Sequence, residues 1–308
     1  MTKDITGRLF RALLAFCFSV VPLHQGWAEA YKPSGSASDS DVYVFGVHPY
    51  ATPQSLFDAY LPVMRYLERK LPGMRFQVEA SRDYADFEAK LAGRRFHFAL
   101  PNPAETLLSF ESGYRVIAKM TPDDDFRGLI VARSGRAPAS VRDLAGKTLC
   151  FPSATAVAGT MLPLLYLHDN GLEAKDIQVR FVGSQFSSLA NAHSGDYAAC
   201  GSTVRFWRVW SRENPDKARD MIVLWRTPSL PHNAVIARDD IPAAVGSRVA
   251  AVLAGMDRDK ELDQGQFTID QQHFELAGDA AYRPMLEFLR RYDEAIGLPP
   301  PLRLPKAR

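Results

Sequence analysis

Residues 143–171 read DLAGKTLCFPSATAVAGTMLPLLYLHDNG, an apolar run followed by a turn of small and hydroxyl residues and then an apolar helical stretch. The segment therefore predicts a strand, a turn and a helix. Amides at the start of a helix lack partners within it and carry the positive end of its dipole, so an oxyanion placed there is stabilised. Ser153 and Thr155 could add hydroxyl donors to such an anion site. The alternative is that they cap the helix and satisfy only the protein's own amides.

The two ends of the chain are predicted to lie outside the folded part. Residues 1–30 combine a basic start, a short apolar stretch and Ala28-Glu29-Ala30, which fits the small-x-small cleavage rule of a secretory signal peptide. Residues 31–40 are rich in Pro, Gly and Ser and predict a flexible linker, and the proline-broken residues 298–308 predict a flexible tail. No later apolar run approaches twenty residues, so we expect a soluble exported protein.

Composition excludes several classes of function. The net charge is +2 and the basic residues are dispersed between acidic ones, which argues against a nucleic-acid-binding face. No CxxC or HxxxH-type cluster is present, so we expect neither a metal site nor a cofactor. Cys150 and Cys200 remain after the signal peptide. They could form a disulfide in an oxidising compartment, remain two buried thiols, or offer thiolates to a soft oxyanion such as arsenite.

Apolar patterns alternate between strands and helices along the chain. The first series predicts strands at 42–47, 74–80 and 96–100, with helices at 55–70, 84–92 and 103–112. A second series starts near residue 129. Two such series predict an α/β protein of two lobes, each a mostly parallel sheet flanked by helices. We assign residues 41–128 and 228–297 to lobe 1 and residues 129–227 to lobe 2, with two crossings that form a hinge.

In open parallel sheets, ligands bind beyond the carboxyl ends of the strands. The loops at these positions contain hydroxyls, amides and aromatic rings with little formal charge, which suits a small polar ligand held by many hydrogen bonds. They are His48–Thr52, Pro101–Pro103, Ser153–Thr155, Gly183–Ser187 and Gly201–Arg205.

Five motifs, in this order, are similar to those of one family: GVHPY (46–50), YLPVMRYLERKL (60–71), FRGLIVAR (126–133), SVRDLAGKTLCFPSAT (140–155) and SLPHNAVIARDDIP (229–242). The chain resembles the periplasmic phosphate-, phosphite- and phosphonate-binding proteins of ABC transporters from about Val42 to Leu298. The resemblance implies a type II solute-binding fold that closes in the periplasm around a small oxyanion and delivers it to an ABC permease. We expect a monomer.

The resemblance also implies the site. The family's Ser-Thr-Ser-Gly turn corresponds to Ser153-Ala154-Thr155-Ala156, in which two positions are altered. Asn233 stands where aminophosphonate binders carry a carboxylate, so an ammonium group lacks its charge partner and an aminophosphonate is disfavoured, whereas Arg205 favours a more anionic ligand. The candidate ligand-binding residues are Tyr50, Asn102, Ser153, Ala154, Thr155, Gln185, Ser202, Thr203, Arg205 and Asn233.

Three other functions compete with transport. A receptor that presents its closed form to a membrane histidine kinase would use the same closure, so the sequence does not separate sensing from transport. A hydrolase with Ser153 or Ser202 as nucleophile, or a redox protein using the two cysteines, would need a GxSxG or CxxC motif that the chain lacks. We therefore predict a protein that is not an enzyme.

Overall fold

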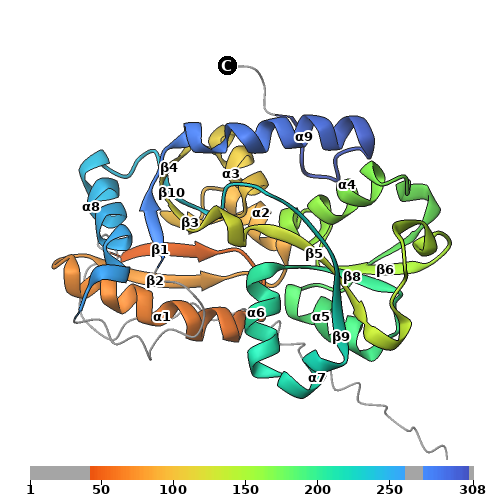
Figure 1. The fold of residues 1–308 in the computed structure, drawn as a ribbon. Helices are drawn as coiled ribbons and strands as arrows, with labels where there is room; N and C mark the ends of the chain where they lie inside the picture. The colour runs from red at the N-terminus through yellow and green to blue at the C-terminus, as the bar shows by residue number, and fades with distance from the viewer. Residues whose placement is uncertain (1–41, 261–272, 305–308) are drawn as a thin grey trace, which may run out of the picture.

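The computed structural model describes residues 42–260 and 273–304. The predicted signal peptide (1–30) and linker (31–40) lie outside the described residues. Two β-sheets, each flanked by helices, lie side by side (Figure 1). None of the described helices is long and apolar enough to cross a membrane.

The first sheet has the strand order β11-β4-β10-β3-β1-β2. Strand β1 pairs in parallel with β2 and β3, whereas β10 and β11 form the antiparallel pairings with their neighbours. Its strands are β1 (Val42–Val47), β2 (Arg75–Ala80), β3 (Phe98–Leu100), β4 (Tyr114–Met120), β10 (Ala234–Arg238) and β11 (Phe274–Leu276). The flanking helices are α1 (Pro53–Lys70), α2 (Tyr84–Ala92), α3 (Pro103–Ser109) and α8 (Ala243–Ala254).

The second sheet has the order β7-β6-β8-β5-β9, with β6 parallel to β7 and β8 and with β5 antiparallel to β8 and β9. Its strands are β5 (Arg127–Arg133), β6 (Thr148–Phe151), β7 (Gln178–Phe181), β8 (Ala199–Thr203) and β9 (Met221–Ser229). Its helices are α4 (Leu162–Asp169), α5 (Gln185–Ser194), α6 (Val204–Glu213) and α7 (Pro215–Arg219).

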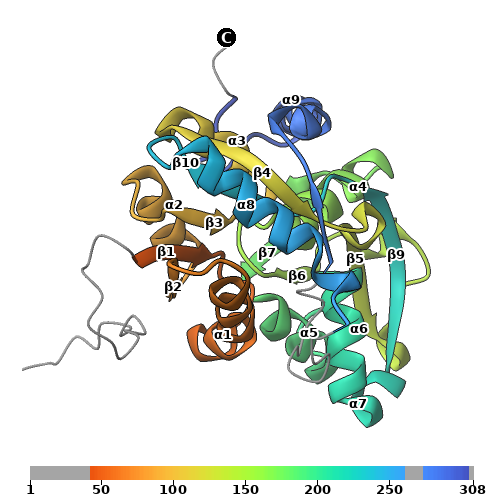
Figure 2. The same cartoon turned by 90° about the vertical axis from the view of Figure 1, so that its left-hand side faces the viewer.

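Three segments connect the two sheets. The chain crosses at residues 121–126, between β4 and β5, and returns at residues 230–233, between β9 and β10. The third is helix α9 (Arg283–Ala295), which runs along the top of the molecule and contacts both α3 and α4 (Figures 1 and 2). Arg291 of α9 forms an ion pair with Asp169 of α4, with 2.7 Å between Nη2 and Oδ1.

Helix α1 illustrates how the sequence positions these elements. Thr52 caps its first turn by accepting a hydrogen bond from the Ser55 amide at 3.2 Å. Its apolar positions recur at helical spacing, and those facing the sheet are buried: Leu56, Ala59, Tyr60, Val63, Met64, Tyr66 and Leu67. A stripe of this kind holds the helix against β2, so the loop before it, which carries residues 48–52, is fixed at the end of β1.

The predicted α/β class with two sheets is confirmed, but the sheets are mixed rather than mostly parallel. The strands next to the crossings pair antiparallel because the chain must leave and re-enter each sheet. Strands β4 and β11 and helices α6 and α7 were not predicted. Residues 298–304, part of the predicted tail, pack on the protein: Leu302 is buried and Arg303 pairs with Glu111.

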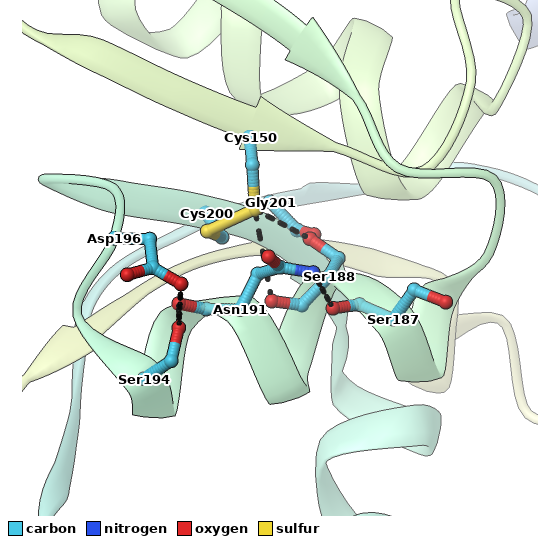
Figure 3. Close-up of a disulfide and its surroundings, with 8 residues drawn as sticks. All are labelled: Cys150, Ser187, Ser188, Asn191, Ser194, Asp196, Cys200 and Gly201. Carbon is cyan, nitrogen blue, oxygen red and sulfur yellow. Dashed lines mark hydrogen bonds between the residues drawn. A yellow bond between two sulfur atoms is a disulfide. The ribbon is translucent and has the colours of Figure 1, made fainter.

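Cys150 and Cys200 form a disulfide between β6 and β8, with sulfurs 2.15 Å apart (Figure 3). The two residues are directly paired in the parallel ladder and both are fully buried. Beneath them, the Ser188 hydroxyl of α5 donates to the Gly201 carbonyl at 2.6 Å. The disulfide is therefore the correct alternative of the three. The thiol and thiolate-ligand alternatives are wrong, because a disulfide sulfur has no thiolate to offer.

Candidate functional site

A small cavity lies between the two sheets, with a volume of about 30 Å³ that the centre of a water molecule can reach. Its lining residues include ones at or after the carboxyl ends of strands in both sheets and ones in both crossings. The lining residues are His48, Tyr84, Asn102, Asp125, Phe126, Ala156, Val157, Ala158, Gln185, Thr203, Arg205, Phe206, His232 and Asn233. A cavity of this size suits a ligand of a few non-hydrogen atoms.

Arg205, in the first turn of α6, is the most unusual of these residues. It is only 4% exposed, and its Nε and Nη2 atoms have no hydrogen-bond partner. Its Nη1 atom donates to the Met120 sulfur at 3.4 Å, and its guanidinium lies 6.0 Å from the centroid of the Tyr50 ring. Among the described residues no carboxylate pairs with it. Burying an unpaired charge costs several kcal/mol, so an anion bound beside Arg205 would remove this cost.

A helix start faces the same cavity. The π-helical turn η6 (Val157–Met161) leads into α4. Its N-cap residue is Ala156, and no side chain caps this helix start with a hydrogen bond. The amides of Val157 and Ala158 stand at this start, where a helix offers no internal acceptor, and both residues line the cavity. The capping alternative for Ser153 and Thr155 is therefore wrong for this turn. Its free amides and dipole add positive potential next to Arg205.

Two buried histidines line the cavity as neutral rings. Burial and then the charge of Arg205 lower the pKa of His48 to about 3. Burial, followed by the charges of Arg205 and Lys119, lowers the pKa of His232 well below its usual value. The Nδ1 atom of His232 accepts from the Asn233 amide at 2.7 Å, so the neutral ring carries its proton on Nε2. This ring can donate to a ligand without adding charge.

The carboxylate of Asp125 is already engaged. It receives two hydrogen bonds from Arg208, at 2.7 Å from Nη2 to Oδ1 and at 3.0 Å from Nη1 to Oδ2. A bidentate pair of this geometry neutralises the carboxylate. The uncompensated charge of the cavity is therefore that of Arg205.

Contacts between the two lobes close the cavity. The Asn102 side chain donates from Nδ2 to the Thr155 carbonyl at 3.1 Å. The backbone amide of Gln185 donates to the Tyr50 carbonyl at 3.3 Å. The rings of Tyr50 and Phe206 lie 4.8 Å apart. Each pair joins a residue next to the first sheet to one next to the second, so the lobes are closed on each other.

Five of the ten candidate residues line the cavity: Asn102, Gln185, Thr203, Arg205 and Asn233. Tyr50 packs beneath Arg205, and Ser202 lies behind Gln185, with 3.5 Å between its Oγ atom and Oε1 of Gln185. The remaining three, Ser153, Ala154 and Thr155, precede the lining residues by a few positions. The helix begins at Val157, later than the hydroxyl-rich turn indicates.

Several lining residues were not among the candidates. His48 lies in one of the five strand-end loops but was not a candidate residue, and the others that were missed are Tyr84, Asp125, Phe126, the stretch 156–158, Phe206 and His232. Tyr84 is the first residue of α2, so including the loop after β2 among the strand-end loops would have found it. Within residues 42–260 and 273–304, no group of three or more His, Cys, Asp or Glu side chains could hold a metal ion.

Gly201 of β8 gives this site a tight backbone packing that can be tested. A Cβ atom there would lie 2.1 Å from the Gly159 carbonyl oxygen and 2.5 Å from the Phe151 ring. Because η6 and β8 would have to separate, we expect Gly201→Ala to lower the free energy of unfolding by about 1–3 kcal/mol or more in urea titrations. Gly135→Ala is the control, since its added Cβ meets no atom within 4 Å. Equal stability of both variants would contradict this packing.

Residues 45–282 match the family model described as the periplasmic substrate-binding protein of the phosphonate ABC transporter. A curated relative, the probable ABC transporter phosphite binding protein PhnD1 of Prochlorococcus marinus (strain MIT 9301), is 24% identical over 140 residues. This match spans 42% of the chain and 47% of the relative, about half its length.

Solved structures give the same fold. PhnD1 of Prochlorococcus marinus in complex with methylphosphonate aligns with a TM-score of 0.74 at 16% identity, over 82% of this chain and 99% of that chain. A binding protein component of an ABC phosphonate transporter of Pseudomonas aeruginosa aligns with a TM-score of 0.71 at 14% identity, over 81% and 87%. These likenesses confirm the predicted two-lobed fold of type II solute-binding proteins.

Proposed function

The chain belongs to the family of periplasmic phosphonate-binding proteins of ABC transporters, and on this basis we propose that it closes around a small oxyanion of the phosphonate, phosphite or phosphate type and delivers it to an ABC permease. Membership confirms the resemblance found in the sequence. The observation that supports the ligand class is the buried guanidinium of Arg205, which has two unpartnered nitrogens at a closed cavity.

The other groups of the cavity fit the same ligand. The amides of Val157 and Ala158 and the neutral His232 ring donate hydrogen bonds, and Phe126, Ala156 and Phe206 form an apolar wall. A tetrahedral oxyanion with a hydrogen or methyl substituent satisfies both surfaces, because its oxygens face the donors and its substituent faces the wall. An ammonium group has no free carboxylate here, since Arg208 engages Asp125. The site therefore disfavours aminophosphonates.

Transport without catalysis is part of the proposal. The two serines considered as nucleophiles, Ser153 and Ser202, do not line the cavity. Delivery requires that the lobes reopen, so contacts across the cleft such as the Asn102–Thr155 hydrogen bond and the Tyr50–Phe206 ring pair must be exchanged for contacts with the permease. The periplasmic location follows the family, and the signal peptide, the monomeric state and the sensor-kinase alternative stay predictions.

A ligand panel tests the proposal. Mature protein, unfolded and refolded to remove bound ligand, would be titrated calorimetrically with methylphosphonate, phosphite, phosphate, sulfate and 2-aminoethylphosphonate. We expect saturable binding of at least one phosphorus oxyanion, with stabilisation of about 2.7 kcal/mol at a hundredfold excess over Kd. The aminophosphonate should bind about 10- to 100-fold more weakly than methylphosphonate. Binding of none of the phosphorus oxyanions would refute the proposal.

A further inference from the structure

A second pocket lies between α2, α3 and the C-terminal segment that carries Pro300 and Pro301. Its volume is about 450 Å³, against about 30 Å³ for the oxyanion cavity. Its wall is formed mainly by apolar residues, among them Leu91, Ala92 and Leu108. This pocket can hold a larger organic molecule than the oxyanion cavity can.

Two carboxyl groups from neighbouring helices line this pocket, Glu88 of α2 and Glu105 of α3. Glu105 is fully buried: its Oε2 atom accepts from the Asn102 amide at 2.8 Å, while its Oε1 atom has no partner. The Oε1 atom of Glu88 is likewise buried and without a partner. In the described part of the chain neither carboxyl joins an ion pair, and Arg303 at the rim pairs with Glu111.

We propose that this pocket binds a small organic ammonium ion with a short apolar chain. Two unpartnered carboxyl oxygens accept hydrogen bonds, and a charged donor gives them both a bond and a counter-charge. Burial and then the neighbouring Glu88 raise the pKa of Glu105 well above its usual value, and burial raises the pKa of Glu88, so a bound cation would supply the counter-charge that both carboxyls lack. A hard cation such as Ca²⁺ needs six or more oxygen ligands, which two carboxyls in an apolar wall do not supply. The apolar wall and the volume are filled by the carbon chain of the ligand.

The pocket shares a structural element with the oxyanion cavity. Glu105 holds the Asn102 amide at the start of α3, and the Asn102 side chain both lines the cavity and donates to Thr155 across the lobes. An ammonium ion on Glu105 therefore acts on the residue that helps to close the cavity. We expect each ligand to change the affinity of the other by the same factor. This coupling rests on the proposed function, whereas binding of the amine does not.

The test is a calorimetric titration of mature protein with n-butylammonium chloride at constant ionic strength, with potassium chloride and 1-butanol as controls. We expect saturable binding of the ammonium ion and at least tenfold weaker binding of both controls. Glu105→Gln keeps an acceptor for the Asn102 amide but replaces the other oxygen by a donor, so it should weaken n-butylammonium at least tenfold. Ala89→Phe, on the exposed side of the pocket wall, should do the same by filling the volume.

Ala251→Phe is the matched control, because Ala251 is an exposed alanine of α8 that lines a groove without carboxyls. It should bind n-butylammonium as the unchanged protein does. Equal binding by Ala89→Phe and the unchanged protein, or no binding of n-butylammonium at all, would overturn the proposal. Methylphosphonate titrated into the same samples keeps the two proposals apart: its binding to Ala89→Phe at unchanged affinity shows an intact oxyanion site whatever the amine does.

Discussion

Replacing Arg205 with Met should weaken oxyanion binding by two to four orders of magnitude. Two guanidinium nitrogens, Nε and Nη2, are buried and unpartnered, and because Arg205 lines the cavity we expect both to donate to the ligand. A hydrogen bond to a charged group contributes about 1.5–3 kcal/mol, so losing two corresponds to about 3–6 kcal/mol. Calorimetric titration with the tightest oxyanion of the panel measures the change.

The same variant should be at least as stable as the unchanged protein when no ligand is present. Arg205 is 4% exposed and has no carboxylate partner, so methionine removes an uncompensated buried charge while keeping most of the side-chain volume. The gain is expected at about 1–3 kcal/mol in urea unfolding of ligand-free protein. Lost binding together with gained stability separates a ligand-binding arginine from one that only supports the fold.

Arg219→Met is the control, because Arg219 lies on the surface of α7 and pairs with the exposed Asp216. It should change neither the affinity nor, beyond about 0.5 kcal/mol, the stability. The oxyanion affinity of Arg205→Lys should lie between those of the unchanged protein and Arg205→Met, since lysine keeps the charge and loses the planar fork of the guanidinium. If Arg205→Met binds the oxyanion as tightly as the unchanged protein does, the anion is held elsewhere.

Removing the disulfide should be the largest single loss of stability. Cys150 and Cys200 are separated by 50 residues, and closing a loop of that length stabilises the folded state by about 4 kcal/mol in the chain-entropy account. We expect the variant Cys150→Ala/Cys200→Ala to melt about 10 °C lower than the oxidised protein. Scanning calorimetry of both proteins measures it.

Protein reduced in denaturant and refolded with reductant should melt near the double variant. The variant itself should not respond to reductant, which controls for other effects of the reagent. Both β6 and β8 lead directly into segments that line the cavity, so oxyanion affinity should be followed in the same samples. A reduced protein that melts with the oxidised one would show that the cross-link contributes nothing.

Local patterns in the sequence were sufficient for the elements that support the site. Helix α2 spans Tyr84–Ala92 as predicted, and α1 differs from its prediction only by starting at Pro53 instead of Ser55. Periodicity succeeds there because each helix buries one face against a sheet, so its neighbours in space follow from its own spacing. It failed for the edge strand β11, which has three residues and gives too short a pattern.

The sequence alone determined the α/β class, the division into two sheets and the resemblance to oxyanion-binding proteins. Each of these depends on patterns among residues that are near one another in the chain. The tertiary structure alone decided which groups carry the site. Arg208 and Asp125, 83 positions apart, neutralise each other and leave Arg205 without a carboxylate. The start of η6 places Ala156–Ala158 at the cavity in place of Ser153 and Thr155. Whether a buried charge is compensated depends on contacts between distant segments, and no local pattern records them.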